Sequence, residues 1–352
     1  MNEYDENNFK NNENSKNNDK IDKDLKNNDE IDKNLKNKRL KDIKALLYGL
    51  SIADSLGVPV EFLSRDIIRK NPVTDMIGYG TYNLPPGSFS DDSSLSFATV
   101  ESLINGYNLE EIAENFKKWL FESWWTPFDK TFDVGNTTAM SIEKMADGMQ
   151  IELCGGIGEH DNGNGSLMRI APLIFFIEDM NLEKRFKIVK EVSSLTHRHF
   201  RSIISCFYYI EYLLGLLEGK NKFEIYEELQ TKFYKELSYL IDNEEEYNEI
   251  NHLKRILDDD IYEFDEDEIR SGGYVISSLE ASLWCFLNSN SYSEAVLKAI
   301  NLGEDTDTVG AITGAIAGIY YGFDDIPDKW IKGIVKSKKI DDLAVRYFKS
   351  LE

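Results

Sequence analysis

The sequence predicts an all-α fold: a helical, bundle-like domain over residues 39–352 that follows a separate N-terminal tail over residues 1–38. Two observations carry this prediction. Apolar residues recur at helical spacing through most of the chain after residue 39. No series of short alternating segments joined by turn residues, which would indicate strands and hairpins, is present. Because no stretch rich in Pro, Gly or Ser divides residues 39–352, we expect one large domain.

Apolar periodicity places the expected helices in chain order. They cover residues 43–57, 93–106, 182–196, 201–218, 222–240, 245–262, 274–288 and 309–322. The last of them contains Gly310, Gly314 and Gly318, which fall on one face at a spacing of four residues. Small residues on one face let two helix axes approach closely, so we expect this helix to pack in the core.

Residues 1–38 form a low-complexity tail that we expect to be disordered. Twelve of them are Asn, and a ten-residue repeat reads NNDKIDKDLK at 17–26 and NNDEIDKNLK at 27–36. Such a segment buries too little apolar surface to offset its ordering entropy. The alternative is a short amphipathic helix, because four apolar residues recur at near-helical spacing: Ile21, Leu25, Ile31 and Leu35. The poor helix propensity of Asn favours disorder.

The chain is strongly acidic. Its 63 Asp and Glu against 40 Lys and Arg give a formal net charge of −23, which argues against a broad grip on nucleic acid and against polybasic binding to a membrane surface. The acids concentrate over 241–270, with thirteen acidic and three basic residues. We expect a solvated helix face or loop there. A calcium loop is excluded, because DDDIYEFDEDEI lacks the Gly that the EF-hand pattern needs at its sixth position.

The cysteines and the N-terminus indicate an intracellular protein. Cys154, Cys206 and Cys285 are odd in number and far apart, so we expect neither a disulfide framework nor a Cys-rich metal site. The first residues lack the apolar stretch of a signal peptide. No run approaches the roughly eighteen uninterrupted apolar residues of a membrane span. We therefore expect a cytoplasmic protein that does not cross a membrane.

Two expected helix starts carry the same set of oxygen ligands. They are Ser90, Asp91 and Asp92 in GSFSDDSSL (87–95), and Asp305, Asp307 and Thr308 in NLGEDTDTVGAITG (301–314). Helix capping explains either set alone, but the repetition favours a shared site. Because acids two residues apart do not share a helix face, Asp305 must lie in the loop before its helix. Four carboxylates brought together in a core repel one another and need cations between them, and oxygen ligands suit Mg²⁺, Mn²⁺ or Ca²⁺. A two-metal centre is the natural outcome.

A glycine-rich motif, DNGNGSLMRIAPL at 161–173, is a weaker signal. Gly163 and Gly165 allow close backbone approach and positive φ. Ser166 can cap the helix that follows, and free N–H groups at such a start suit a phosphate. Taken alone, the motif is more simply explained as a turn.

Two other short motifs have plain structural explanations when they are taken alone. FDVGNTT (132–138) is explained as a loop and a helix cap. In SLTHRHF, His197 and His199 lie close together, and a structural hydrogen-bonding role is the simpler interpretation of such a histidine.

Taken together and in order, the motifs resemble the ADP-ribosylglycohydrolase family, of the dinitrogenase reductase-activating glycohydrolase type. The resemblance covers about residues 43–325. It rests on GLSIADSLGVPVEF (49–62), GSFSDDSSLSFATVESL (87–103), FDVGNTT (132–138), GNGSLMRIAPL (163–173), LTHRHFRS (195–202), GGYVISSLEASLWCFL (272–287) and AINLGEDTDTVGAITGAIAGIYYG (299–322). It implies a single large orthogonal bundle of helices, usually monomeric, that uses two Mg²⁺ or Mn²⁺ ions to remove ADP-ribose from modified side chains.

The resemblance also implies roles for individual residues. The implied metal ligands are Ser90, Asp91, Asp92, Asp305, Asp307 and Thr308. The implied catalytic residues are Asp133 as a candidate general acid or base, Glu61 as an acid that controls access or metal loading, and Asp92 and Asp305. The implied ligand-binding residues are Gly135, Asn136, Asn164, Gly165, Ser166, Met168, His197 and Tyr274. The family's usual Thr-Asp-Asp-Thr is here Ser-Asp-Asp-Ser, which keeps the ligating hydroxyl.

The implied substrate is an ADP-ribosylated protein or a small molecule that bears ADP-ribose, cleaved at the ribose C1″ through an oxocarbenium-like state. Two alternatives stay open: a hydrolase of another small N- or O-glycoside, and a non-catalytic relative that binds ADP-ribose or has a structural role. The intact metal residues argue against the non-catalytic relative. Arginine and serine linkages are both compatible with the sequence.

Overall fold

The structure is a computed structural model that describes residues 33–241 and 243–352. Residues 42–352 form one compact unit, and the following description concerns this unit. The predicted disorder of residues 1–32 lies outside the described residues. Residues 33–38, which were also expected to be disordered, are helical. Adding residues to a helix that is already nucleated gains one hydrogen bond each, and the good helix propensity of Lys here offsets the poor propensity of Asn.

The all-α prediction is confirmed, and the described residues contain no β-strand. A helix over 42–57 opens the unit and is followed by the short 3-10 helix η1 (Val58–Val60). The α-helices that follow are α2 (Arg65–Ile68), α3 (Asp91–Leu103), α4 (Leu109–Glu122), α5 (Asn136–Ala146), α6 (Leu167–Ile170), α7 (Ile174–Ile177), α8 (Leu182–Ser194), α9 (Phe200–Leu217), α10 (Lys222–Leu240), α11 (Glu244–Asn248), α12 (Lys254–Leu257), α13 (Val275–Leu287), α14 (Tyr292–Asn301), α15 (Thr306–Tyr321), α16 (Asp328–Gly333) and α17 (Ser337–Ser350).

The prediction of one continuous helix over residues 245–262 is wrong. Residues 245–262 do not form a continuous helix but are divided among α11, a 3-10 turn over Glu249–Leu253, α12 and a second 3-10 turn over Ile261–Glu263. Tertiary bonds explain the interruptions. The carbonyl oxygen of Asp259 accepts hydrogen bonds from Tyr226 and Gln230 of α10, each at 2.8 Å. These bonds fix the backbone in a shape that helical periodicity alone does not predict.

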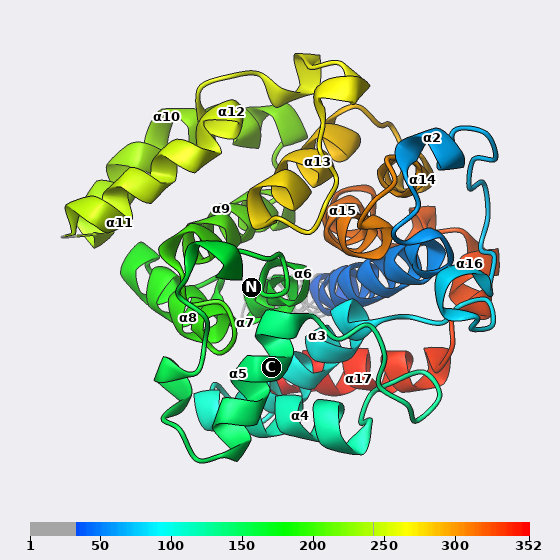
Figure 1. The fold of residues 1–352 in the computed structure, drawn as a ribbon, viewed down its shortest axis with the longest axis horizontal. Coiled ribbons are helices and arrows are strands. Elements are labelled where there is room, and N and C mark those ends of the chain that lie inside the picture. The colour runs from blue at the N-terminus through cyan, green and yellow to red at the C-terminus, as the bar shows by residue number, and fades with distance from the viewer. Residues whose placement is uncertain (1–32, 242) are drawn as a thin grey trace, which may run out of the picture. The chain divides into compact units, whose positions relative to one another are not determined.

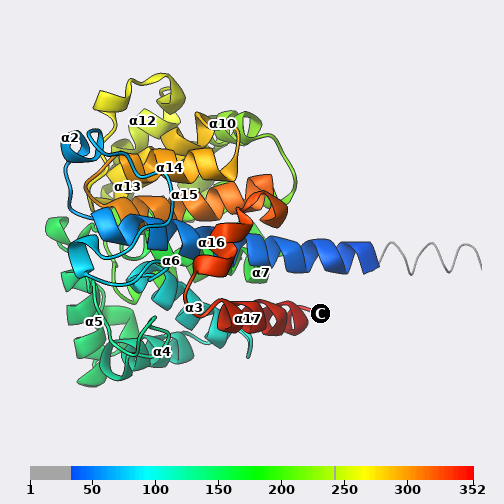
Figure 2. The ribbon, with the colours of Figure 1, turned by 90° about the vertical axis from the view of Figure 1, so that its right-hand side faces the viewer.

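Helix α15 lies at the centre of the unit and contacts α3, α6, α9, α13 and α14 (Figure 1). It also packs against the 42–57 helix with almost no space between the two backbones. A Cβ atom on Gly314 would clash with the carbonyl oxygen of Gly49, and one on Gly318 would clash with that of Ala45. In Figure 2 α14, α15 and the 42–57 helix lie in neighbouring layers. The expected close approach through small residues is therefore confirmed.

Two helical stretches have the length and apolar composition that a membrane span needs, Lys33–Val60 and Phe200–Leu217. In each, 94% of the most apolar window is buried within the structure. Burial of this kind is typical of helices in a protein core, which pass the same test of length and composition.

Substituting Gly314→Val should strongly destabilise the protein, because the new side chain has no space against the Gly49 backbone. Overpacking of this kind lowers the free energy of unfolding by about 1–3 kcal/mol. Chemical denaturation measures the change. Lys349→Val places the same side chain on an exposed helical position of α17 and should shift stability by only about 0.5 kcal/mol. Equal effects of the two variants would contradict the close packing.

Candidate active site

The first predicted ligand set lies at the start of α3. Ser90 is the N-cap, and its hydroxyl accepts a hydrogen bond from the backbone N–H of Asp92 at 3.3 Å. The same hydroxyl donates to Oδ2 of Asp92 at 2.9 Å. Asp91 and Asp92 occupy the first helical turn and are both buried. The capping interpretation of this motif is confirmed, and it leaves the carboxylates free for the ligand role that was also predicted.

The second set lies at the start of α15 and faces the first. Asp305 is the N-cap residue, outside the regular helix as predicted, whereas Asp307 and Thr308 lie in the first turn. The Thr308 hydroxyl lies 3.4 Å from Oδ2 of Asp92, so the two helix starts meet. Two segments 213 positions apart in the chain (92 to 305) therefore contribute to one site.

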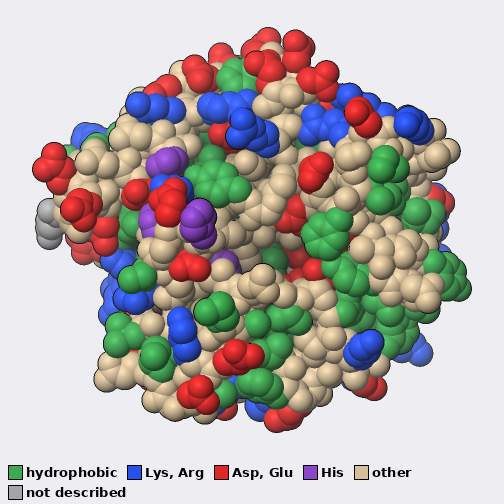
Figure 3. All heavy atoms as spheres, viewed as in Figure 1, with side chains coloured by type: hydrophobic (Ala, Val, Ile, Leu, Met, Phe, Trp, Pro, Cys, Tyr) green, Lys and Arg blue, Asp and Glu red, His purple; other side chains and the backbone are tan. Residues whose placement is uncertain are grey.

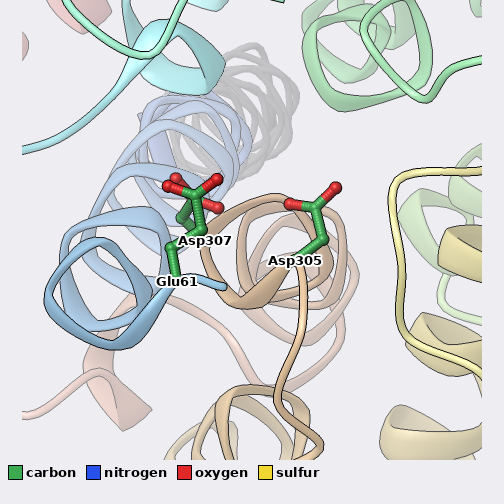
Figure 4. A group of neighbouring side chains, drawn as sticks. All are labelled: Glu61, Asp305 and Asp307. Atoms are coloured by element: carbon green, nitrogen blue, oxygen red, sulfur yellow. The ribbon is translucent and has the colours of Figure 1, made fainter. Parts of the chain in front are cut away.

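The carboxylates gather into two groups. In one, oxygen atoms of Glu61, Asp305 and Asp307 lie within 4.8 Å of one another, and in the other, those of Asp91, Asp92 and Asp133 do. Figure 4 shows Glu61 from the segment after η1 next to Asp307, with Asp305 on the other side of the start of α15. In Figure 3 acidic side chains line the hollow at the centre of the face. The site is thus a hollow with an acidic floor.

Within the site, three buried carboxylate oxygens have no hydrogen-bond partner among the described residues: Oε2 of Glu61, Oδ1 of Asp92 and Oδ2 of Asp307. A buried, unpartnered carboxylate oxygen is strongly unfavourable unless something binds it. Burial and then the neighbouring acids raise the pKa of Glu61 to about 9. The same causes raise the pKa of Asp91 and Asp307 well above the usual range. These residues fit divalent cations with oxygen ligands, which would satisfy the free oxygens and offset the repulsion.

Sequence reasoning missed Asp54, which holds the first ligand set in place. Its carboxylate is fully buried beneath the start of α3. It accepts hydrogen bonds from the backbone N–H of Ser90 at 2.9 Å and of Ser93 at 3.1 Å, and from the Ser93 hydroxyl at 2.5 Å. Burial raises the pKa of Asp54 to about 7, although these hydrogen bonds act in the opposite direction. An Asp in the middle of a buried helix gives no local signal of this partner.

Asp54→Ala should weaken Mg²⁺ binding by about 10- to 100-fold, because residues that orient metal ligands have effects of that size. The N–H groups of Ser90 and Ser93 would lose their common acceptor. Isothermal titration with Mg²⁺ measures the dissociation constant. Asp54→Asn, which keeps one acceptor oxygen, should fall between the wild type and the alanine variant. An unchanged dissociation constant in Asp54→Ala would contradict the role.

Asp133 joins the carboxylates from a loop. Its backbone is in the left-handed region, with φ of 52°, and Oδ1 accepts a hydrogen bond from the Tyr82 hydroxyl at 2.6 Å. Tyr82, which sequence reasoning also missed, thus fixes the orientation of this carboxylate. Gly135 is the N-cap of α5, and Asn136 is its first residue. Both are exposed, so they remain accessible to a ligand above the site.

The glycine-rich loop reaches the site through Asn164. Its side-chain amide donates to Oδ2 of Asp305 at 2.8 Å, and its backbone N–H donates to the carbonyl of Gly273 at 3.0 Å. Gly165 is needed for close approach, since a Cβ atom there would lie 2.8 Å from Cε1 of His197. Neither Gly163 nor Gly165 adopts the positive φ that glycine allows, so close approach is the property that this loop uses.

The expected capping by Ser166 is also wrong. Its side chain caps no helix and is fully buried, where it accepts a hydrogen bond from the Ser193 hydroxyl at 3.0 Å and contacts Sγ of Cys206. Met168 is buried one residue into α6. Because α6 is a single four-residue turn, it offers a much smaller dipole than a long helix. Both side chains therefore support the loop from within.

His197 supports the same loop from below. It is buried, and Nδ1 lies 2.7 Å from the Thr196 hydroxyl. Burial, together with the charge of Arg169, lowers the pKa of His197 to about 3, so the imidazole is neutral at physiological pH. Arg169 is itself buried and hydrogen-bonds the carbonyl of Gly165 and the hydroxyl of Thr196. His197 therefore makes the structural hydrogen bond that was expected, with Thr196. One edge of its ring lies against Gly165 of the loop.

Tyr274 stands on the other rim of the site, and 37% of its surface is exposed. A buried arginine holds it: Nη1 of Arg201 donates to the tyrosine hydroxyl at 3.2 Å, and the guanidinium lies 5.9 Å from the ring centroid. Arg201 is itself fixed by Glu159 at 2.7 Å and by Glu249 at 2.8 Å. Glu249 belongs to the acidic 241–270 segment, so this segment is more than the solvated surface that its charge predicted.

The fold and the site together define an all-helical protein whose core presents two groups of carboxylates suited to divalent cations. Comparison with known proteins identifies the class further: the sequence profile of the ADP-ribosylglycohydrolase family matches residues 35–352. The chain belongs to this family, and its members hydrolyse glycosidic bonds of ADP-ribose, so the protein is an ADP-ribosyl hydrolase. The family prediction and the all-α prediction are both confirmed.

Individual relatives are similar along most of their length. The ADP-ribosylarginine hydrolase Tri1 of Serratia proteamaculans is 33% identical over 311 residues, which cover 88% of this chain and 79% of the relative. The ADP-ribosyl-[dinitrogen reductase] glycohydrolase of Rhodospirillum rubrum is 28% identical over 290 residues, covering 80% and 86%. A solved structure titled ADP-ribosylglycohydrolase-related protein complex superposes with a TM-score of 0.74 at 26% identity, covering 90% of this chain and all of that one.

Proposed function

We propose that this protein removes ADP-ribose from the arginine side chains of modified proteins, with two Mg²⁺ or Mn²⁺ ions in the acidic site. The observation that carries the proposal is the set of three carboxylate oxygens in the site, on Glu61, Asp92 and Asp307, that are buried and have no partner among the described residues. Carboxylates arranged in this way suit cations better than any neutral ligand. The arginine linkage is supported by two relatives named as ADP-ribosylarginine hydrolases, at 33% and 31% identity.

The ligands in this proposal come from both helix starts. They are Asp305 and Asp307 at the start of α15, with Glu61 beside them, and Asp91 and Asp92 at the start of α3. Asp133, which lies next to Asp91 and Asp92, is assigned to proton transfer. The hydroxyls of Ser90 and Thr308, both next to Asp92, complete the set. When bound, divalent cations stabilise negative charge on substrate oxygens and make a bound water more acidic. An oxygen-only donor set of this kind does not suit Zn²⁺.

The reaction is the addition of water across the bond between C1″ of the ribose and the arginine nitrogen. The C1″–N bond breaks, the water oxygen bonds to C1″, and a proton from the water goes to the departing nitrogen. Asp133, oriented by the Tyr82 hydroxyl, accepts the proton of the water and returns it to the leaving group. Asn164, held by Gly273 and Asp305, positions the ribose. Tyr274, held by Arg201, contacts the nucleotide part from the rim.

We also propose that the protein works as a monomer in the cytoplasm. Support for a reducing compartment comes from the three cysteines, which are all free and buried.

Release of free ADP-ribose tests the proposed function. The purified chain is incubated with Mg²⁺ and either an arginine-ADP-ribosylated or a serine-ADP-ribosylated protein. We expect release from the arginine substrate, loss of release in excess chelator, and recovery when Mg²⁺ is returned. Asp305→Ala is the inactive control. Release from neither substrate, or a full rate in chelator, would contradict the proposal.

A further inference from the structure

A groove of about 800 Å³ adjoins the acidic site. Gly273, Tyr274, Leu302 and Glu304 line part of it. Its wall lies against the acidic site, because a Cβ atom on Gly273 would lie 3.1 Å from Oδ2 of Asp305. A group that leaves a ribose held in the site would therefore depart next to this groove.

Glu304, which lines the groove, and Phe62, which is bonded to it through the backbone, share an unusual backbone conformation. The Phe62 N–H donates to the carbonyl of Glu304 at 2.7 Å, and the Glu304 N–H donates to the carbonyl of Leu63 at 2.8 Å. Phe62 and Glu304 both have φ of 64°, in the left-handed region that favours glycine. Phe62 directly follows Glu61, and Glu304 directly precedes Asp305. This Phe62–Glu304 pair is thus fixed rigidly to both sides of the metal-ligand set.

The side chains of Phe62 and Glu304 are exposed to solvent. Phe62 is 67% exposed, and the carboxylate of Glu304 has no hydrogen bond or ion pair with the part of the chain that the structure describes. A left-handed conformation is unfavourable by about 1 kcal/mol or more for a residue with a side chain. Glycine would remove that strain, so the position retains a charged side chain at the expense of stability.

The basic groups of the groove leave Glu304 unpaired. The guanidinium of Arg65 is directed to the carbonyls of Leu302, Glu266 and Ile269. Arg69 pairs with Glu266 and Asp267. Arg270 is exposed and has no ion pair among the described residues. The Glu304 carboxylate is therefore available to a cation that enters from solvent.

We propose that Glu304 binds the guanidinium of the departing arginine, that Phe62 stacks on it, and that this pair sets the preference for arginine over serine linkages. The inference rests on the proposed function. A carboxylate and an aromatic face together match a guanidinium, which is planar, always charged and able to donate several parallel hydrogen bonds. A serine hydroxyl carries no charge, so it gains nothing comparable from the pair.

The ratio of hydrolysis rates for an arginine-ADP-ribosylated peptide and a serine-ADP-ribosylated peptide tests the inference. We expect Glu304→Gln to lower the arginine-to-serine ratio of kcat/KM by about tenfold or more, the effect of losing one charge-assisted bond. Glu304→Gly should lower the ratio equally, while its melting temperature stays the same or rises because the strain is removed. Arg270→Gln removes a charge of opposite sign from the same groove and should not lower the ratio.

The outcomes separate cleanly. An unchanged ratio in both Glu304 variants overturns the role of Glu304. A ratio that falls as far in Arg270→Gln as in Glu304→Gln also overturns it, because the effect would then be general damage to the groove. If the wild type releases ADP-ribose from neither peptide, the proposed function fails, and this inference fails with it.

Discussion

Asp92→Asn is expected to abolish hydrolysis and, at the same time, to stabilise the metal-free protein. Asp92 is fully buried, and Oδ1 has no partner. Burial, and then the charges of Asp54, Asp305 and Asp133, raise its pKa well above the usual range. The carboxylate therefore destabilises the metal-free protein, and it stabilises the structure only when it binds a cation. Asparagine has nearly the same shape without the charge.

The expected sizes follow from these two roles. Loss of metal-dependent charge stabilisation raises the activation free energy by several kcal/mol, which lowers kcat by about 10³-fold or more. In chelator, the free energy of unfolding at pH 8 should rise by on the order of 1 kcal/mol, because the variant no longer buries an ionisable carboxylate. Kinetics of ADP-ribose release and thermal unfolding measure the two effects on the same sample.

The control for Asp92→Asn is Asp328→Asn. The Asp328 side chain is 86% exposed, and its one ion pair with the described residues is to Lys332, four residues along α16. We expect this variant to match the wild type in activity and to change stability by a few tenths of a kcal/mol at most. Retained activity in Asp92→Asn, or a metal-free Asp92→Asn protein clearly less stable than the wild type, would be incompatible with the metal-ligand role.

The second large effect is a pH dependence that metal reverses. The pKa of Asp54 is raised to about 7 and that of Glu61 to about 9 in the folded state, against values near 4 in the unfolded chain. At pH values between about 4 and about 9, the folded state therefore binds more protons than the unfolded state. Stability of the metal-free protein must then fall as pH rises from about 5 to about 9.

Divalent cations should act in the opposite sense. They bind the ionised carboxylates and displace protons, so Mg²⁺ affinity rises over the same pH range. We expect the gain in melting temperature from saturating Mg²⁺ to be small at pH 5.5 and largest near pH 9. Thermal unfolding with and without chelator across this range provides the measurement. A gain that is independent of pH would show that the buried carboxylates are not the ligands.

Sequence reasoning located the acidic cluster because its motifs are local. An N-cap serine followed by two acids, and an Asp-Thr-Asp-Thr run before an apolar helix, can each be recognised within a few residues. Their repetition predicted that the two helix starts meet, and the Thr308–Asp92 contact confirms it. The glycine spacing of α15 predicted its close packing for the same reason.

The supporting residues could not be found in this way. Asp54, Tyr82 and Arg201 act on partners 36, 51 and 73 positions away in the chain. No local pattern marks a residue whose role depends on such a distant contact. The described acids of the 241–270 segment are mostly exposed, as their charge predicted, but the bond of Glu249 to buried Arg201 could not be predicted, because it depends on the fold and not on nearby sequence. Charge composition alone indicates a solvated surface there.

The central claim, two cations held between the start of α3 and the start of α15, is tested most directly by crystallography of the full chain soaked with Mn²⁺. Anomalous scattering locates the ions without reference to activity. The account predicts two peaks about 3.5–4 Å apart, with Glu61, Asp305 and Asp307 on one side and Asp91 and Asp92 on the other. No anomalous peak between these side chains, at Mn²⁺ concentrations that support hydrolysis, would contradict it.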